Sequence, residues 1–219
     1  MGRFLHKHPF PPFNLEAAQK LIVGTLPPPR FTTGNLKPGD VNFSYGSIDG
    51  QLWPILERIF DLGLSYENTQ QAIKERQAFL ISRNIGVCDI VNAAYRDKID
   101  ASDIGLLEVS LRPMFEILSN FPQIDTLLFT GGNSKNGPEY FFRKLCREYD
   151  VSLKVVSPKV PRIHQLNWAS REITTVSLTA PSGAANRAVG SMKDYKALKI
   201  KNPAFNTIDY RVMQYAPYF

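Results

Sequence analysis

The sequence has few of the residues that build metal clusters, disulfide scaffolds or membrane spans. Its only cysteines, Cys88 and Cys146, are too few for a four-cysteine zinc site or an all-cysteine iron–sulfur cluster, and we expect both to be reduced and buried. No apolar run approaches the roughly 20 residues of a membrane helix, and the N-terminus lacks the apolar core of a secretory signal. We therefore expect a cytoplasmic protein with no membrane partner.

Two further shortages concern metals and phosphates. His6 and His8 alternate near the N-terminus without a nearby carboxylate or cysteine, so we interpret them as surface histidines and expect no metal. The chain has no G-x-x-x-x-G-K-[ST] segment, and Gly131-Gly132 lacks the third glycine of a dinucleotide fingerprint, so no cofactor is expected. The chain has fewer acidic than basic residues, with 20 Asp and Glu and 26 Lys and Arg. The resulting net charge of +6 favours a polyanionic partner.

The length and composition indicate one domain. With 219 residues, 43% of them hydrophobic, residues 1–219 can form a single core, and we expect a monomer. Residues 1–14 combine three prolines with three phenylalanines, a composition that suits an extended arm laid over the body. Residues 196–219 end in an aromatic-rich stretch that should dock on the body, because Tyr210, Met213 and Phe219 are costly to leave in water.

Short apolar runs alternate with helical patterns along the chain, which is typical of an α/β fold. The first run, residues 21–29, reads L-I-V-G-T-L-P-P-P, and its three prolines end the strand abruptly. The spacing of apolar residues predicts helices over residues 52–60, 66–82 and 138–149. Further strands are predicted over residues 85–91, 124–130, 151–156 and 173–178.

Four loops follow strand ends or open a helix, and we expect them to meet at one edge of the sheet, where α/β folds collect ligands. They cover residues 24–29, 45–51, 88–92 and 180–187. Together they offer an aromatic ring, two carboxylates, several amides and a cation. This set of side chains suits a nitrogenous base better than a phosphorylated sugar.

Five segments, in this order, resemble the uracil-DNA glycosylase superfamily, most closely its mismatch-specific and hypoxanthine-acting branches. The segments are L-I-V-G-T-L-P-P-P, Y-G-S-I-D-G-Q-L-W-P-I-L, G-V-C-D-I-V, L-L-F-T-G-G and L-T-A-P-S-G-A-A-N-R, and the similarity spans residues 20–195. The resemblance implies a three-layer αβα sandwich with a central parallel four-stranded sheet. It also implies an enzyme that flips a deaminated base, of the uracil or hypoxanthine class, out of DNA and hydrolyses its N-glycosidic bond.

The resemblance assigns roles to residues on all four loops. Tyr45 stands where the family stacks its base, and Thr25 lies beside the sugar as a catalytic candidate. The remaining candidates for base contacts are Gly24, Gln51 and Asp89, although for Asp89 the residues favour a structural, hydrogen-bonding role. The DNA-binding loop that enters the gap left by the flipped base would comprise Pro181, Ser182, Gly183, Asn186 and Arg187.

The chain departs from the family at the positions that activate water. Leu26 and Gly50 stand where related branches carry an asparagine, and the late histidine of the broad uracil enzymes is replaced by Leu178-Thr179. Asp49, next to Gly50, is the remaining catalytic candidate, although an aspartate at this place could instead cap the following helix.

Two alternatives follow from the same residues. The first is a protein of the same fold that binds lesion DNA or a base without turnover. The second is a nucleoside- or nucleotide-metabolising α/β enzyme. Tight, salt-sensitive DNA binding without turnover would favour the first, and turnover of free nucleosides without DNA affinity would favour the second.

Overall fold

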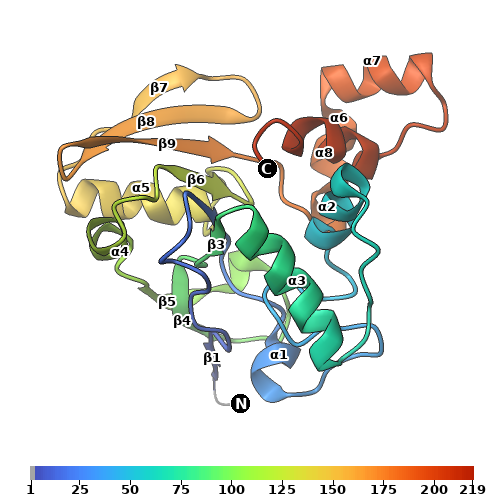
Figure 1. The fold of residues 1–219 in the computed structure, drawn as a ribbon, viewed down its shortest axis with the longest axis horizontal. Helices are drawn as coiled ribbons and strands as arrows, with labels where there is room; N and C mark the ends of the chain where they lie inside the picture. The colour runs from blue at the N-terminus through green and yellow to red at the C-terminus, as the bar shows by residue number, and fades with distance from the viewer. Residues whose placement is uncertain (1–2) are drawn as a thin grey trace.

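The apolar run before Gly24 forms the strand around which the fold is built. The computed structural model describes residues 3–219 and arranges them in two sheets with helices packed around them (Figure 1). The strands are β1 Phe4–Lys7, β2 Lys20–Val23, β3 Ile85–Val87, β4 Val91–Arg96, β5 Leu107–Leu111, β6 Thr126–Phe129, β7 Lys154–Ser157, β8 Arg162–Trp168 and β9 Arg171–Ser177. The helices are α1 Pro29–Thr33, α2 Leu52–Phe60, α3 Gln70–Ser82, α4 Met114–Asn120, α5 Pro138–Glu148, α6 Asn186–Ser191, α7 Lys193–Lys201 and α8 Thr207–Tyr215.

The large sheet has six strands in the order β3-β2-β6-β9-β8-β7. The pairings β3–β2, β2–β6 and β6–β9 are parallel, whereas β9–β8 and β8–β7 are antiparallel. The α/β class expected from the sequence is therefore present, but the sheet is mixed and wider than the four parallel strands that were expected. The parallel pairings bring the ends of β2, β6 and β9 to the same edge.

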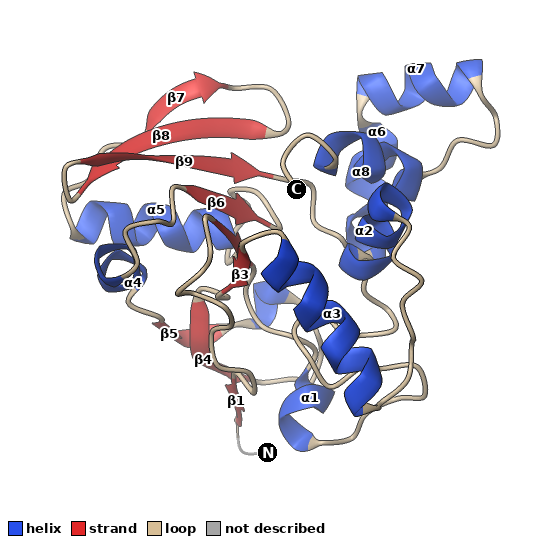
Figure 2. Cartoon of the chain, in the orientation of Figure 1, coloured by secondary structure: helices blue, strands red, loops and turns tan. Residues whose placement is uncertain are grey.

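Helices cover both faces of this sheet (Figure 2). Because successive strand residues point to opposite faces, Leu21 and Val23 pack in a core with α4 and α5, whereas Ile22 packs in a second core with α2 and α3. Trp53 of α2, 2% exposed, is the largest side chain in the second core. Cys88 and Cys146 are both free and buried in the first core, as expected.

The N-terminal arm is part of a second, three-stranded sheet of order β1-β4-β5. Residues 1 and 2 of the expected arm lie outside the described residues, and Phe4 to Lys7 pair antiparallel with β4. The interpretation of His6 as a surface histidine is wrong: this pairing turns His6 inward, where it is fully buried and Arg96 Nε donates to its Nδ1 at 2.9 Å. Burial lowers the pKa of His6 to about 4, so the ring is neutral.

The helices with the strongest periodicity lie where the sequence places them. Helix α2 begins at Leu52 and ends at Phe60, as expected, and α5 spans all but one residue of its predicted range. The helix expected from residue 66 begins instead at Gln70, because Thr69 Oγ1 accepts a hydrogen bond from the backbone N–H of Ala72 at 3.2 Å and caps it. The sequence also did not reveal β8, whose side chains alternate without a clear apolar face.

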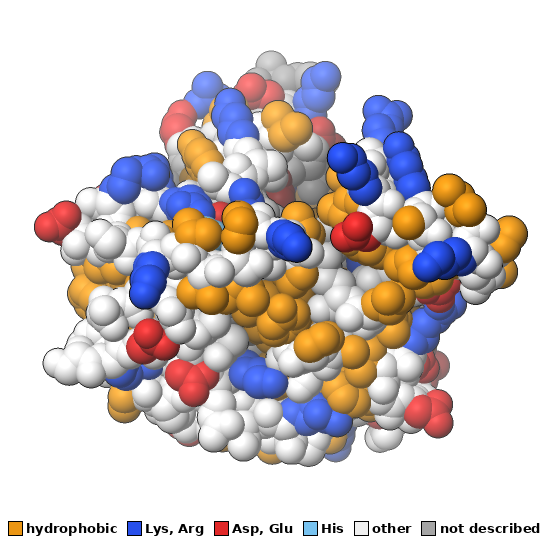
Figure 3. All heavy atoms as spheres, turned by 90° about the horizontal axis from the view of Figure 1, so that it is seen from above, with side chains coloured by type: hydrophobic (Ala, Val, Ile, Leu, Met, Phe, Trp, Pro, Cys, Tyr) orange, Lys and Arg blue, Asp and Glu red, His pale blue; other side chains and the backbone are white. Residues whose placement is uncertain are grey.

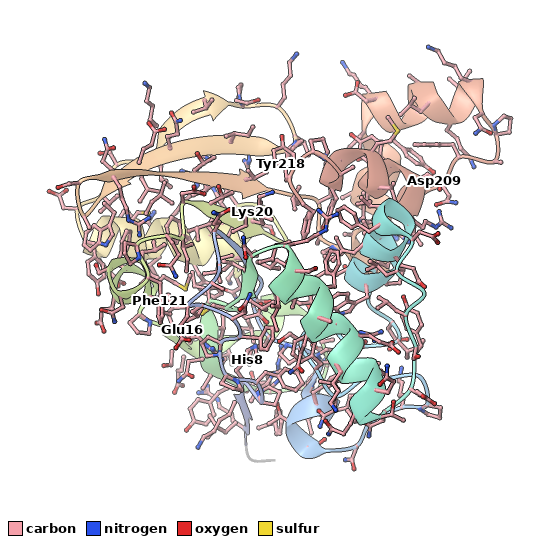
Figure 4. All side chains as sticks on the ribbon, viewed as in Figure 1. His8, Glu16, Lys20, Phe121, Asp209 and Tyr218 are labelled. Atoms are coloured by element: carbon pink, nitrogen blue, oxygen red, sulfur yellow. The ribbon has the colours of Figure 1, made fainter. Side chains whose placement is uncertain are left out.

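The C-terminal segment docks on the body. Helix α8 begins with a capping box formed by Asn206 and Asp209, and Lys20 Nζ donates to the carbonyl of Tyr218 at 2.8 Å (Figure 4). Tyr210 and Phe219 are buried, as expected, whereas Met213 is 54% exposed. Helix α8 contacts α2, and this contact places the end of the chain beside the predicted ligand edge.

Candidate functional site

The four loops expected at the sheet edge converge on one cavity of about 210 Å³. Its lining includes Thr25, Tyr45, Gln51, Asp89 and Ser182, at least one residue from each loop, together with Asp103 from a short 3-10 turn at Asp103–Gly105. The loops come together because β2, β6 and β9 run parallel and end at the same edge of the sheet. The convergence predicted from the sequence is thus present in the structure.

Backbone contacts join the second and fourth loops. Gly50 forms an antiparallel bridge with Ser182, and the N–H of Gln51 donates to the carbonyl of Pro181 at 2.9 Å. The side chains of Pro181 and Ser182 both line the cavity. One wall of the cavity is therefore a hydrogen-bonded unit made from segments 130 residues apart in the chain.

Arg211 of α8 holds this wall from behind. Its guanidinium is fully buried and donates to the carbonyl of Ala180 at 2.9 Å, to that of Ser182 at 3.2 Å, to Gln51 Oε1 at 2.9 Å and to Asn186 Oδ1 at 2.8 Å. No carboxylate pairs with it among the described residues, and burial lowers its pKa. Because Oε1 of Gln51 is engaged, the amide nitrogen Nε2 is the free end of that side chain.

Asp89 braces the floor of the cavity. Its Oδ1 accepts from the N–H of Gly24 at 2.8 Å and from the hydroxyl of Tyr45 at 2.7 Å, and its Oδ2 lies 2.9 Å from His8 Nε2. With three partners and a side chain only 7% exposed, Asp89 satisfies the structural interpretation of this residue. The surface interpretation of His8 is wrong, because its side chain is 3% exposed and reaches Asp89 from the N-terminal arm.

Tyr45 lines the cavity and is fixed at its hydroxyl. The hydroxyl lies between Asp89 and Thr130 Oγ1, 3.3 Å away, and burial together with the charge of Asp89 raises the pKa of Tyr45 well above its ordinary value. Its backbone has φ +59°, an uncommon conformation for a residue with a side chain. Gly24 lies behind this ring and does not line the cavity, so the structure gives it no contact with a bound base.

Asp103 is the second carboxylate in the lining of the cavity, beside Asp89. Thr25 Oγ1 donates to its Oδ1 at 2.8 Å, while Oδ2 has no hydrogen-bond partner among residues 3–219. Burial raises the pKa of Asp103 to about 6, and the nearby charge of Asp89 acts in the same direction. A carboxyl group with this pKa exchanges protons close to neutral pH, which is the property required of a general acid or base.

Asp49 does not reach the cavity. Its carboxylate is 59% exposed and pairs with Lys37 Nζ at 2.8 Å and with Arg30 Nη2 at 3.1 Å. It does not cap α2 either, whose N-cap residue is Gln51 without a side-chain hydrogen bond. The salt bridges lower the pKa of Asp49, so it remains a charged surface group. Neither role expected from the sequence fits this placement.

The tip of the late loop is exposed. Gly183 and Arg187 face outward and do not line the cavity, while Asn186 is half-buried, accepts from Arg211 and begins α6. The loop thus has an inner side, Pro181 and Ser182, and an outer side that is free to contact a partner.

Sequence reasoning missed the contributions of Asp103, His8 and Arg211. The only local signal for Asp103 is A-S-D-I, which is typical of a turn and gives no indication of where in the fold that turn lies. His8 contacts a residue 81 positions away in the chain. Arg211 contacts residues that lie between 25 and 160 positions away. No short motif carries information over such distances.

The raised pKa of Asp103 predicts a pH-dependent cost to stability. The unfolded chain releases this proton near pH 3.8 and the folded chain near pH 6, so the free energy of unfolding should fall as pH rises from about 4 to about 6. The wild type should lose on the order of 2 kcal/mol relative to Asp103→Asn over this range. Urea unfolding of both proteins at pH 4, 5, 6 and 7 measures the difference; a difference that stays constant would contradict the burial of a titrating carboxyl.

The described residues contain no group of three or more His, Cys, Asp or Glu side chains that could hold a metal ion. Among residues 3–219 no helix combines the length and apolarity of a bilayer span. Comparison of the chain with protein-family models, curated proteins and solved structures finds no match, so its chemistry is inferred from the geometry of the cavity.

Proposed function

We propose that this protein hydrolyses the N-glycosidic bond of a deaminated base that is flipped out of DNA into the cavity. The observation that carries the proposal is the pairing of a fixed aromatic ring, Tyr45, with a half-buried carboxyl of raised pKa, Asp103, in one small cavity. The resemblance of the five sequence segments to the uracil-DNA glycosylase superfamily supports the same reaction. The proposed active species is a monomer, because one chain supplies the lining of the cavity.

The fold is consistent with this proposal. Strands β3, β2, β6 and β9 would be the central parallel sheet of a glycosylase-like αβα sandwich, with β8 and β7 as an added edge. The helices of both faces fit such a three-layer arrangement.

Cleavage of the N-glycosidic bond requires groups that stabilise opposite charges on the sugar and on the leaving base. As the bond from the sugar to the base breaks, positive charge grows on the sugar and negative charge on the leaving base. In the proposed mechanism the Asp103 carboxylate faces the sugar, stabilises its positive charge and accepts a proton from the water that adds to C1′. Thr25 positions that carboxylate through its hydrogen bond to Oδ1. Asp103 thereby takes the role that the sequence suggested for Asp49.

Gln51, also in the lining of the cavity, offers a donor for the leaving base. Arg211 engages Gln51 Oε1, so the amide presents its Nε2 hydrogens, for which residues 3–219 provide no acceptor. Deamination replaces an exocyclic amino donor with a carbonyl acceptor. A fixed amide donor therefore favours uracil or hypoxanthine over cytosine or adenine, since an unmatched donor facing an amino group loses its hydrogen bond.

The cavity size also suits a single base. Its volume of about 210 Å³ is below the roughly 300–1,000 Å³ of pockets that enclose drug-sized ligands. Tyr45 provides a ring against which a planar base can stack, and base–aromatic stacking contributes about 1–3 kcal/mol. The lining contains no lysine or arginine, which would be expected in a site for a free nucleotide with its phosphates.

An excision assay tests the proposal. Pure protein is incubated with DNA duplexes that carry one uracil, hypoxanthine or xanthine and then treated with alkali, which cuts the strand at abasic sites. We expect cuts at the uracil or hypoxanthine duplex and none in the undamaged control. Absence of cuts on every duplex and on the matching single strands overturns the proposal. Lesion binding without cuts would identify the silent alternative, and release of base from free nucleosides alone would identify the nucleoside enzyme.

A further inference from the structure

Helix α7 is basic and has no buried residue. Residues 187–201 carry five cations and one acid, a net charge of +4 in a chain whose total is +6. The helix projects from the body beside α6 (Figure 1), and seen from above, Lys and Arg side chains lie on this side of the surface as well as on other parts of it (Figure 3). Residues 187–201 are thus a strongly basic segment, and α7 holds most of its charge on an exposed element.

Three of the four lysines of α7 are exposed, whereas Lys199 is half-buried and its Nζ donates to the carbonyl of Pro203 at 2.6 Å. The inner face carries Tyr195, whose ring lies 6.0 Å from that of Phe205 and 5.9 Å from that of Tyr210. On a helix of 3.6 residues per turn, Lys193 and the 82% exposed Ile200 lie opposite Tyr195, and Lys196 and Lys201 lie on either side of them. Among the described residues, none of these three lysines forms a salt bridge or hydrogen bond.

Helix α7 is connected directly to the wall of the cavity. Ser182 lines the cavity, the 3-10 turn at Gly183–Ala185 and helix α6 follow it, and α7 begins two residues after α6 ends. Helix α6 contacts that turn, α7 and α8, and Arg211 of α8 fixes the start of α6 through Asn186. The orientation of α7 is therefore set by the same contacts that shape the cavity.

We propose that the outer face of α7 binds the phosphates of the DNA strand that flanks the flipped nucleotide. The proposal rests on the proposed function and adds to it the surface that holds the duplex. Lys193 and Lys201 are eight residues apart, about 12 Å along the helix axis. This distance spans about three phosphates of one strand. Three unpaired lysines over that length can contact the phosphates, and such contacts do not depend on the base sequence.

The test compares two sets of lysine substitutions. In the first variant Lys193, Lys196 and Lys201 are changed to Gln. In the control variant Lys74, Lys144 and Lys154, three exposed lysines on α3, α5 and β7 that have no salt bridge among the described residues, are changed to Gln. Both variants lose the same charge, so a general effect of net charge is the same in each. Binding to an undamaged 20-base-pair duplex is followed by fluorescence anisotropy between 50 and 300 mM NaCl.

We expect the α7 variant to bind the duplex about tenfold or more weakly than the wild type at 100 mM NaCl. The slope of log K against log [NaCl] should become less negative by about 2.7, because each of the three lost phosphate contacts contributes about 0.9. The control variant should keep most of the wild-type slope and affinity. Because the substituted side chains are exposed, the α7 variant should unfold at the same midpoint as the wild type. Equal midpoints would show that this variant is folded.

The outcomes separate this inference from the proposed function. Equal weakening in both variants, or none in the α7 variant, overturns the α7 proposal even if excision is intact. Tighter, α7-dependent binding to single-stranded RNA or to anionic lipid vesicles than to the duplex overturns it in favour of those partners. Selective loss of duplex binding in the α7 variant supports it, and failure of the excision assay alongside that loss removes only the proposed reaction.

Discussion

Replacing Asp103 with Asn is expected to lower the rate of base excision by about 10²–10⁴-fold, the range typical of a positioned general acid or base. Asn keeps the shape and the hydrogen bond from Thr25 but has no negative charge to oppose the positive sugar and cannot accept a proton from water. The wild-type rate should also rise with pH through about 6, because only the ionised carboxylate is active. Single-turnover excision of a uracil duplex between pH 5 and 8 measures both effects.

The matched comparison is Asp49→Asn. Asp49 is an exposed carboxylate bound by Lys37 and Arg30 and does not line the cavity, so its loss should change the single-turnover rate less than threefold. The reverse pattern, a large loss at Asp49 and a small one at Asp103, would reject the mechanism and restore the interpretation that the sequence alone suggested. A wild-type profile without an inflection near pH 6 would argue against Asp103 even if its substitution is harmful.

Replacing Gly24 with Ala is expected to lower the stability of the protein strongly, because the added methyl group would enter the buried hydrogen-bond network behind Tyr45. A Cβ at this position would lie 2.4 Å from the Tyr45 hydroxyl, 2.8 Å from Asp89 Oδ1 and 3.0 Å from Thr130 Oγ1. All three atoms belong to one buried network, so the ring or the carboxylate must move. We expect a loss of about 2–4 kcal/mol in the free energy of unfolding, from overpacking and from broken hydrogen bonds to Asp89.

Gly183→Ala is the control for this change. Gly183 lies on the late loop of the same site, yet a Cβ there would meet no atom within 4 Å. Its substitution should change the free energy of unfolding by less than about 0.5 kcal/mol. Urea unfolding of both variants, followed by circular dichroism, gives the comparison. Similar stability for Gly24→Ala and the wild type would mean that Tyr45 is not held against Asp89.

The parts of the fold that were predictable are those whose signal is local. The apolar run before Gly24 and the prolines after it mark where β2 ends, and the period of Leu52 to Phe60 marks α2. Strand ends and turn residues then indicate which loops share an edge, because parallel strands place successive ends together. Strand β7 overlaps the strand predicted over residues 151–156, whereas β8 carries no such signal, because Arg162–Trp168 contains no continuous apolar run.

The candidate site was predictable only as a location. The loops that carry Tyr45 and Ser182 were expected at this edge of the sheet, and both residues line the cavity. The identity of the catalytic carboxylate was not predictable, because it depends on where in the fold the turn at Asp103–Gly105 lies. Asp49 is adjacent in sequence to the cavity-lining Gly50, and yet Arg30 and Lys37 draw its side chain outward. Asp103 follows a different strand and enters through a contact with Thr25 that no local pattern specifies.

Both ends of the chain help to hold the cavity, although neither supplies its lining. Every lining residue named above lies between Thr25 and Ser182, but His8 supports the floor and Arg211 supports the wall. A nascent polypeptide that has emerged only as far as α7 would contain the complete lining and still lack the guanidinium that clamps it. During synthesis the pocket is therefore completed late, and a fragment trimmed to its lining residues would not keep its shape.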